Sequence, residues 1–222
     1  MDSKTVSKQI RKEIKPLLAD NGFTRFTSRS AWRFGQETVD VVNFQSFNAY
    51  NADVLGCTTY SFSVNLGVYP IYLARELLVK HHEGSPAPEE YMCPFRRSLR
   101  KRLAQPEFPD VRIWYVDPSG DYLVKALHDV RMLLLSEGLT WFGRFASRSE
   151  VFRTLREDPC DMETGTWGFG NVPSPVRSYL LGFAAMAVGE REIARFELEK
   201  AQLSGCFQGD AERIRRALQS LA

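Results

Sequence analysis

Residues 23 to 69 show a two-residue hydrophobic period, which constrains the fold more than any other feature of the sequence. The clearest stretch is SFSVNLGVYP, residues 61–70, in which apolar residues such as Phe62 and Val64 alternate with polar or small ones. Such alternation is typical of a β-strand with one buried face. Strands are predicted near 23–28, 31–35, 38–47 and 58–69, with a turn at 35–37 and a loop at 48–56. The short links between them predict an antiparallel meander.

The first twenty residues have helical spacing instead. Val6, Ile10 and Ile14 lie on one side, and Asn21-Gly22 supplies a C-terminal stop. Pro16 falls inside this pattern and lacks a backbone donor, so we expect a kink or two short helices. The basic residues on the other faces are interpreted as solvated.

Three further elements are predicted between the meander and residue 120. YLARELLVKHH, residues 72–82, is predicted to be a short helix. CPFRRSLRKRL is predicted to be a second helix, with Pro94 in its first turn and Phe95, Leu99 and Leu103 as its apolar stripe. RIWYVD, residues 112–117, is the candidate for a fifth strand.

The remainder of the chain has strong helix signals. Leucines from 123 to 134 mark one helix, and Ser147 and Glu150 form a capping box that opens another. Ser174 and Pro175 begin a helix that Gly189 ends, and two more follow at 190–203 and 211–221.

These elements predict an α+β fold. An N-terminal helix precedes a four- to five-stranded antiparallel sheet with helices packed on one side, and an all-helical C-terminal part follows. We expect a sheet domain at 1–157, a Gly- and Pro-rich linker at 158–173, and a helical hairpin plus terminal helix at 174–222, packed on the first domain.

Composition narrows the class of protein. The chain has 222 residues and a net charge of +2 from 29 basic and 27 acidic residues, so no global field favours nucleic acid or membrane. The four cysteines form no C-x-x-C pair, so we expect reduced thiols. The N-terminus is a charged amphipathic stretch rather than a signal peptide. We therefore predict a cytoplasmic protein without membrane or dedicated nucleic-acid binding.

The polar side of the predicted strands is the first candidate site. Its residues are amides and hydroxyls rather than charged groups, which suits a surface that becomes covered. Asn43 and Asn65 are expected to be covered by the protein itself, whereas Gln45 and Tyr69 are the better candidates for contact with a ligand or partner. The full set is Asn43, Gln45, Ser61, Ser63, Asn65 and Tyr69.

The second candidate is a basic run within the predicted helix after Pro94. Such a face could hold phosphates or an acidic partner, and an equally good interpretation is a solvated face paired with Glu89, Glu90 or Glu107. The run comprises Arg96, Arg97, Arg100, Lys101 and Arg102.

Neither a metal nor a cofactor is predicted. His81 and His82 are adjacent, so on a helix they point about 100° apart and cannot share a metal ion. Cys93 is interpreted as a small buried thiol rather than a nucleophile.

Several motifs together resemble a known family. The two longest are VVNFQSF at 41–47 and FSVNLGVY at 62–69. The others are N-G-F at 21–23, Trp32-Arg33, Cys93-Pro-Phe-Arg and Trp114. With the preceding helix, these are similar to the bacterial family called domain of unknown function 4304 (DUF4304), over roughly residues 4–145. The resemblance implies a small α+β domain with an antiparallel sheet, and no assigned activity.

The C-terminal helices resemble a single tetratricopeptide repeat, whose small and bulky packing positions are occupied by Leu181-Gly182, Gly189, Ala194, Leu198 and Ala201. Such repeats need about three copies to be stable alone. A helical hairpin that reached the same packing by convergence is the alternative.

The function predicted from these observations is a non-catalytic binding or interaction module that uses the polar sheet face and the basic helix. One alternative is an enzyme acting on a phosphate-bearing small molecule, held by Arg96, Arg97 and Arg100. Another is a bacterial toxin-neutralising, immunity-type protein with a protein partner.

Overall fold

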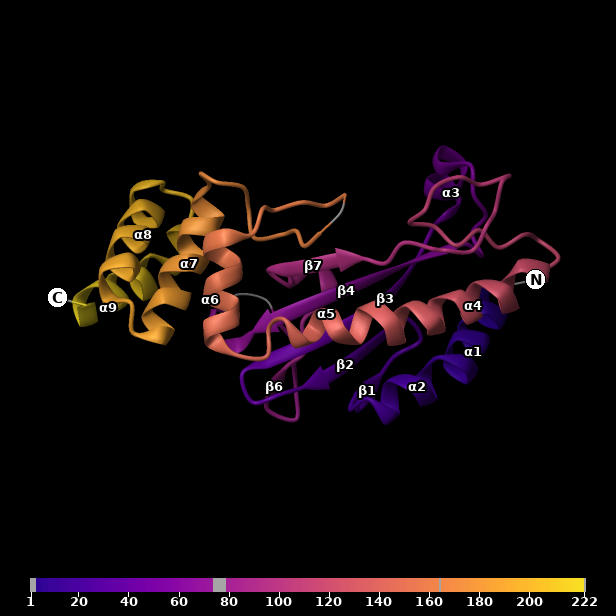
Figure 1. Cartoon of the computed structure of the whole chain (residues 1–222), viewed down its shortest axis with the longest axis horizontal. Helices are drawn as coiled ribbons and strands as arrows, with labels where there is room; N and C mark the ends of the chain where they lie inside the picture. The colour runs from indigo at the N-terminus through magenta and orange to yellow at the C-terminus, as the bar shows by residue number, and fades with distance from the viewer. Residues whose placement is uncertain (1–2, 74–78, 164, 222) are drawn as a thin grey trace. The chain divides into compact units, whose positions relative to one another are not determined.

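The computed structural model describes residues 3–73, 79–163 and 165–221. It has the predicted α+β fold, built around a five-stranded antiparallel sheet with the strand order β1-β2-β3-β4-β7 (Figure 1). Its strands are β1 Arg25–Phe26, β2 Ser30–Phe34, β3 Thr38–Ser46, β4 Phe62–Pro70 and β7 Phe95–Ser98. The meander predicted from 23 to 69 is confirmed.

The N-terminal helix is broken in two, as Pro16 predicts. Helix α1 spans Ser3–Glu13 and α2 spans Lys15–Asp20, with Pro16 in the first turn of α2, where its missing N–H breaks no helical hydrogen bond. Val6, Ile10 and Ile14 are all buried. Their side of α1 therefore belongs to the core.

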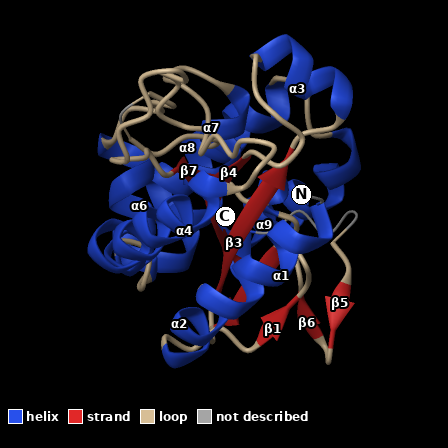
Figure 2. Ribbon diagram, turned by 90° about the vertical axis from the view of Figure 1, so that its right-hand side faces the viewer, coloured by secondary structure: helices blue, strands red, loops and turns tan. Residues whose placement is uncertain are grey.

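One long helical segment follows the sheet. It comprises α4 Asp121–Leu133, the π-helical turn η3 Leu134–Gly138 and α5 Leu139–Gly143, and it runs along the sheet (Figures 1 and 2). A Cβ atom on Gly138 would lie 3.5 Å from Leu66 of β4. The apolar side of β4 therefore packs against this segment.

The remaining helices begin and end where their caps predict. Ser147 accepts a hydrogen bond from the Glu150 amide at the start of α6 Arg148–Glu157, and Ser174 does the same for Arg177 in α7 Pro175–Val188. Gly189 ends α7 with a φ of 87°. Helices α8 Arg191–Leu203 and α9 Ala211–Leu221 follow, and α7, α8 and α9 lie side by side (Figure 1).

The predicted loop at 48–56 contains a helix that the sequence pattern does not reveal. Helix α3 spans Ala49–Leu55, begins at Asn48, whose side chain accepts from the Asn51 amide at 2.7 Å, and ends at Gly56 in the left-handed conformation. Only Ala52 of this helix is buried. The helix therefore lacks the apolar stripe by which helices are recognised.

The prediction of a helix after Pro94 is wrong, because this segment forms the fifth strand of the sheet, β7. Phe95 and Leu99 are four residues apart, a spacing that also places two side chains on one side of a strand. The amide of Leu99 donates to the Val64 carbonyl at 2.9 Å, extending the pairing with β4. Strand β7 is the last strand of the sheet, and a backbone bridge from Arg96 to Trp167 occupies part of its outer edge. The fifth strand predicted at 112–117 is reduced to a bridge between Trp114 and Phe62.

The helix predicted at 72–82 is also corrected where the structure describes it. Ile71–Leu73 form a 3-10 turn, η1, and residues 74–78 lie outside the described residues. His81–His82 form strand β5, which pairs with β6 Ser85–Pro86 in a hairpin. Glu83 and Gly84 have φ of 51° and 81°, the positive values that a two-residue hairpin turn requires. Two further 3-10 turns are η2 Glu90–Met92 and η4 Gln208–Asp210.

The chain divides into two compact units. The first comprises residues 1–35, 40–67 and 97–142, and the second comprises residues 36–39, 68–96 and 143–222. The domain boundaries expected at 157 and 174 remain a prediction. Among the described residues, no helix combines the length and the apolar character needed to cross a membrane.

Candidate functional site

The amides of the predicted polar face bond to other side chains of the sheet. Asn43 donates to the Ser30 hydroxyl at 3.0 Å, which joins β3 to β2. Asn65 donates to the Gln45 side chain at 3.0 Å and accepts from the Ser98 hydroxyl at 2.7 Å, which joins β4 to both β3 and β7. Asn65 is buried, whereas Gln45 is exposed. Of these amides, Gln45 thus offers the most surface to a partner.

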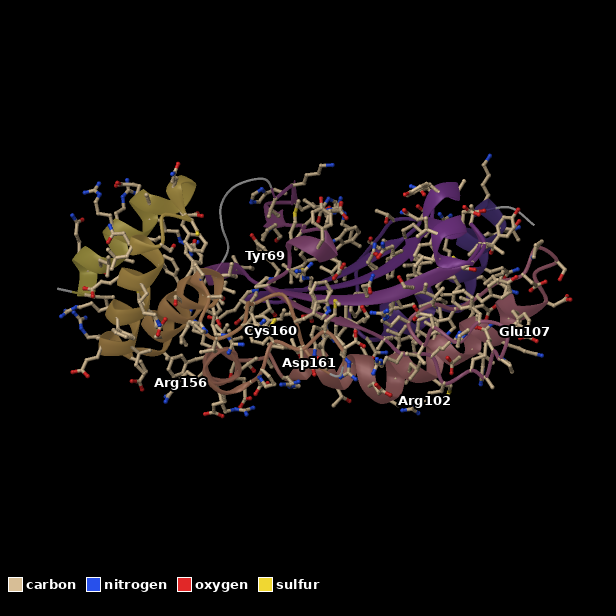
Figure 3. All side chains as sticks on the ribbon, turned by 90° about the horizontal axis from the view of Figure 1, so that it is seen from above. Tyr69, Arg102, Glu107, Arg156, Cys160 and Asp161 are labelled. Carbon is tan, nitrogen blue, oxygen red and sulfur yellow. The ribbon has the colours of Figure 1, made fainter. Side chains whose placement is uncertain are left out.

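The basic run does not form one anion-binding face. Arg97 pairs with Glu137 at 2.9 Å, and Arg102 (Figure 3) pairs with the other oxygen of the same carboxylate at 2.5 Å. Lys101 is buried and donates to Gln105 and to the Phe108 carbonyl. Arg100 is exposed. The acidic residue that neutralises Arg97 and Arg102 is thus Glu137, which lies far along the sequence from the run.

Tyr69 and Arg96 line the same cavity in the second unit, which we call the Tyr69 pocket. Tyr69 lies at the end of β4 (Figure 3), and the pocket has a volume of about 450 Å³. Most of its wall is apolar. The lining residues with polar side-chain groups are Tyr69, Tyr91, Cys93, Arg96 and Tyr179. The apolar wall includes Pro70, Leu73, Met92, Val176, Leu180 and Phe207.

Arg96 is held in place by the chain segment before α7. Its backbone exchanges two hydrogen bonds with Trp167, at 2.8 and 2.9 Å, and its guanidinium lies 3.7 Å from the centre of the Trp167 ring. Gly168 allows this approach, because a Cβ atom there would lie 2.7 Å from the Pro94 carbonyl oxygen and 2.8 Å from Arg96 Nε. The stacked guanidinium thus has a fixed orientation at the pocket wall.

Arg96 and its neighbours have unsatisfied polar atoms. Arg96 Nε, Trp167 Nε1 and Glu90 Oε1 are buried and have no hydrogen-bond partner among the described residues. Burial raises the pKa of Glu90 to about 7, and the charge of Arg96 partly opposes this rise. Burial likewise lowers the pKa of Arg96. Buried polar atoms without partners are rare in native proteins and call for an explanation.

Tyr69 and Cys93 are two further polar residues of the pocket, and both are buried, at 4% and 2% exposure. Burial raises the pKa of the Tyr69 hydroxyl, and the nearby Cys93 thiol adds to this. The Cys93 thiol donates weakly to the Glu89 carbonyl at 3.7 Å. The Tyr69 hydroxyl is therefore neutral at physiological pH, and Arg96 carries the charge.

Two residues of α7 were not found from the sequence: Tyr179, which lines the pocket, and Arg177, which bonds to the segment before α7. Tyr179 of α7 stacks on Phe207 with ring centres 4.6 Å apart and accepts from Arg213 at 2.8 Å. Arg177 is 5% exposed, and its guanidinium donates to the carbonyls of Leu155, Asp158 and Gly170. A charged residue one turn after a helix cap gives no sequence signal for this role. The segment 158–173, predicted as a linker, is thereby tied to α6 and α7.

No cluster of three or more histidine, cysteine or acidic side chains suited to a metal ion occurs among the described residues. His81 and His82 lie on the hairpin strand β5, where adjacent side chains point to opposite faces.

Comparison with known proteins gives one match. No curated protein and no solved structure matches the chain. A family model described as "Domain of unknown function (DUF4304)" matches residues 14–144, which is more than half of the chain. The match covers Tyr69, Cys93 and Arg96, whereas the pocket residues from Gly168 to Phe207 lie outside it. The chain therefore belongs to the DUF4304 family, as the motifs from N-G-F to Trp114 indicate.

Proposed function

We propose that this protein is a non-catalytic binding module and that its ligand is a small organic anion with an apolar body, bound in the Tyr69 pocket. The anionic group faces Arg96, and the apolar body lies against the aliphatic and aromatic wall. Tyr69 supplies a hydroxyl that can donate to the ligand.

The observation that carries this proposal is the combination of cavity and cation. Small-molecule sites are typically apolar cavities of roughly 300 to 1,000 Å³ with a few polar groups that fix the ligand's orientation. The Tyr69 pocket, at about 450 Å³, falls in this range. Arg96 lines this cavity and forms no salt bridge with any described residue, so its charge can attract an anionic group in the pocket.

The alternative of an enzyme acting on a phosphate-bearing molecule receives less support. It requires Arg96, Arg97 and Arg100 to act together, whereas Arg97 is already paired with Glu137. The immunity-type alternative requires a protein-binding surface, for which Gln45 remains the candidate contact. A pull-down with the products of neighbouring genes tests it, and recovery of one specific protein would favour it over the small-molecule proposal.

A direct test is isothermal titration of the full chain with octanoate and naphthoate, each compared with its neutral amide. The carboxylates should bind and the amides should bind roughly tenfold more weakly, because only the carboxylate forms a charge-assisted hydrogen bond. Arg96→Gln should remove this preference for the anion. Tyr69→Phe should weaken binding without abolishing it.

Arg100→Gln is the matched control, since Arg100 is exposed and does not line the pocket. It should bind octanoate as the unchanged protein does. Equal binding of carboxylate and amide, or equal losses in Arg96→Gln and Arg100→Gln, would refute the proposal. Circular dichroism of each variant establishes that the fold is retained.

A further inference from the structure

A second hollow lies in the first unit, beside α1, and has a volume of about 540 Å³. Lys4, Ser7, Lys8 and Arg11 of α1 line it together with Ser28 from the loop between β1 and β2. Residues three and four apart are neighbours on a helix surface, so these four α1 residues form one continuous face. We call this hollow the α1 cleft.

The charge of the α1 cleft is uncompensated. No acidic residue among those that the structure describes lines it, and Lys4, Lys8 and Arg11 form no ion pair with any described residue. Glu13 is the one acidic residue of α1, and it pairs with Lys12 at 3.6 Å. Like charges four apart on a helix repel each other. A bound anion would relieve this repulsion.

A smaller hollow adjoins the cleft and adds to its positive charge. It shares Arg11 and Ser28 with the cleft, and Lys15 and Arg29 also line it, again with no acidic residue in the described part of the chain. Arg29 Nη1 is buried without a hydrogen-bond partner among the described residues. Five basic side chains thus surround the two hollows, and one of them has a buried unpaired donor.

We propose that the α1 cleft binds the phosphate group of a small soluble phosphate compound. Lysine, arginine and serine hydroxyl groups are donors to phosphate oxygens, and a dianion matches a cleft whose described lining has cations and no carboxylate. This site is independent of the Tyr69 pocket. A membrane surface is less well matched, because the apolar residues of α1, such as Val6 and Ile10, are buried in the core rather than available to lipid.

The test is titration of the full chain with inorganic pyrophosphate, with Lys8→Gln and Lys12→Gln as a matched pair of variants. Both remove one lysine charge from the exposed side of the same helix, and only Lys8 lines the cleft. Lys8→Gln should weaken pyrophosphate binding roughly tenfold, the effect of losing one charge-assisted hydrogen bond. Lys12→Gln should change the affinity less than about twofold.

Three outcomes would overturn the proposal. The first is no binding of pyrophosphate to the unchanged protein. The second is an equal loss in Lys8→Gln and Lys12→Gln, which would show a general charge effect. The third is Lys8-dependent sedimentation with phosphatidylglycerol vesicles in the absence of pyrophosphate binding, which would assign the surface to a membrane. Because pyrophosphate and octanoate are titrated separately, a negative result with pyrophosphate does not bear on the proposal for the Tyr69 pocket.

Discussion

Arg33 of β2 and Asp40 of β3 form an ion pair in which Arg33 Nε and Nη2 each lie 2.8 Å from the same carboxylate oxygen. A third guanidinium nitrogen donates to the Asn21 carbonyl at 3.2 Å, and the guanidinium lies against the rings of Phe23 and Phe142. The N-G-F and Trp-Arg motifs are thus parts of one cluster. This cluster connects the end of α2 to the sheet and to α5.

Removal of the Asp40 carboxylate should destabilise the fold. Burial raises the pKa of Asp40 to about 6, and the Arg33 charge opposes this rise, so the pair is ionised at pH 7.5. Asp40→Ala leaves Arg33 without its anion. We expect a loss of about 2 to 3 kcal/mol in the free energy of unfolding, below the range for fully buried pairs because the Arg33 side chain is 30% exposed.

Urea denaturation at pH 7.5 measures this loss. Glu13→Ala is the control, because it breaks the exposed Lys12–Glu13 pair and should cost less than about 0.5 kcal/mol. Similar losses in the two variants would contradict the structural role assigned to Asp40.

The hydrogen bonds between Asn65, Gln45 and Ser98 predict that substitution of Asn65 costs more stability than substitution of Gln45. Asn65 is 7% exposed and bonds to both Gln45 and Ser98, so Asn65→Ala should cost about 1 to 3 kcal/mol. Gln45 is exposed, and water can replace its side chain, so Gln45→Ala should cost less than about 1 kcal/mol. Thermal unfolding of the two variants gives the comparison. A larger loss for Gln45→Ala than for Asn65→Ala would be inconsistent with this network.

Gly168 should tolerate no side chain, whereas Gly189 should tolerate one at moderate cost. Both have positive φ, 103° and 87°, which is strained for other residues. A Cβ atom on Gly168 would also lie 2.7 Å from the Pro94 carbonyl oxygen, while a Cβ atom on Gly189 meets nothing within 4 Å. Gly168→Ala should therefore cost at least about 2 kcal/mol and Gly189→Ala about 1 kcal/mol. Equal losses by thermal unfolding would show that the close approach to Arg96 contributes nothing.

Caps and hydrophobic periods account for the parts of the fold that were predicted. Ser147, Ser174 and Gly189 mark helix ends through local hydrogen bonds or backbone conformation, which depend on residues close in sequence. Strand β7 is predicted as a helix from the sequence because the spacing of Phe95 and Leu99 fits both the helical and the strand period. Hydrogen bonding to β4 makes the segment a strand rather than a helix, and the spacing of its apolar residues does not reveal this pairing.

The candidate site was predictable only in part. Tyr69 and Arg96 were singled out for separate reasons, one as a polar strand residue and the other as a member of a basic run. The pocket that contains both also depends on Gly168, Tyr179 and Phe207, which lie up to 138 positions from Tyr69 along the chain. Glycines and aromatic residues occur throughout the sequence, so their type alone does not identify those that converge.

Stability and ligand binding should both depend on pH through Glu90. Glu90 has a pKa of about 7 in the folded protein, raised from 4.5 by burial, so the folded state holds this proton more tightly than the unfolded state does. Its contribution to stability is present below pH 4.5 and is lost as pH rises through 7.

Above pH 7 the Glu90 carboxylate is charged near Arg96, where it competes with an anionic ligand. If the Tyr69 pocket binds octanoate, affinity should therefore fall between pH 6 and pH 8. Glu90→Gln should make affinity nearly constant over this interval, and an equal fall in that variant would exclude Glu90 as the titrating group.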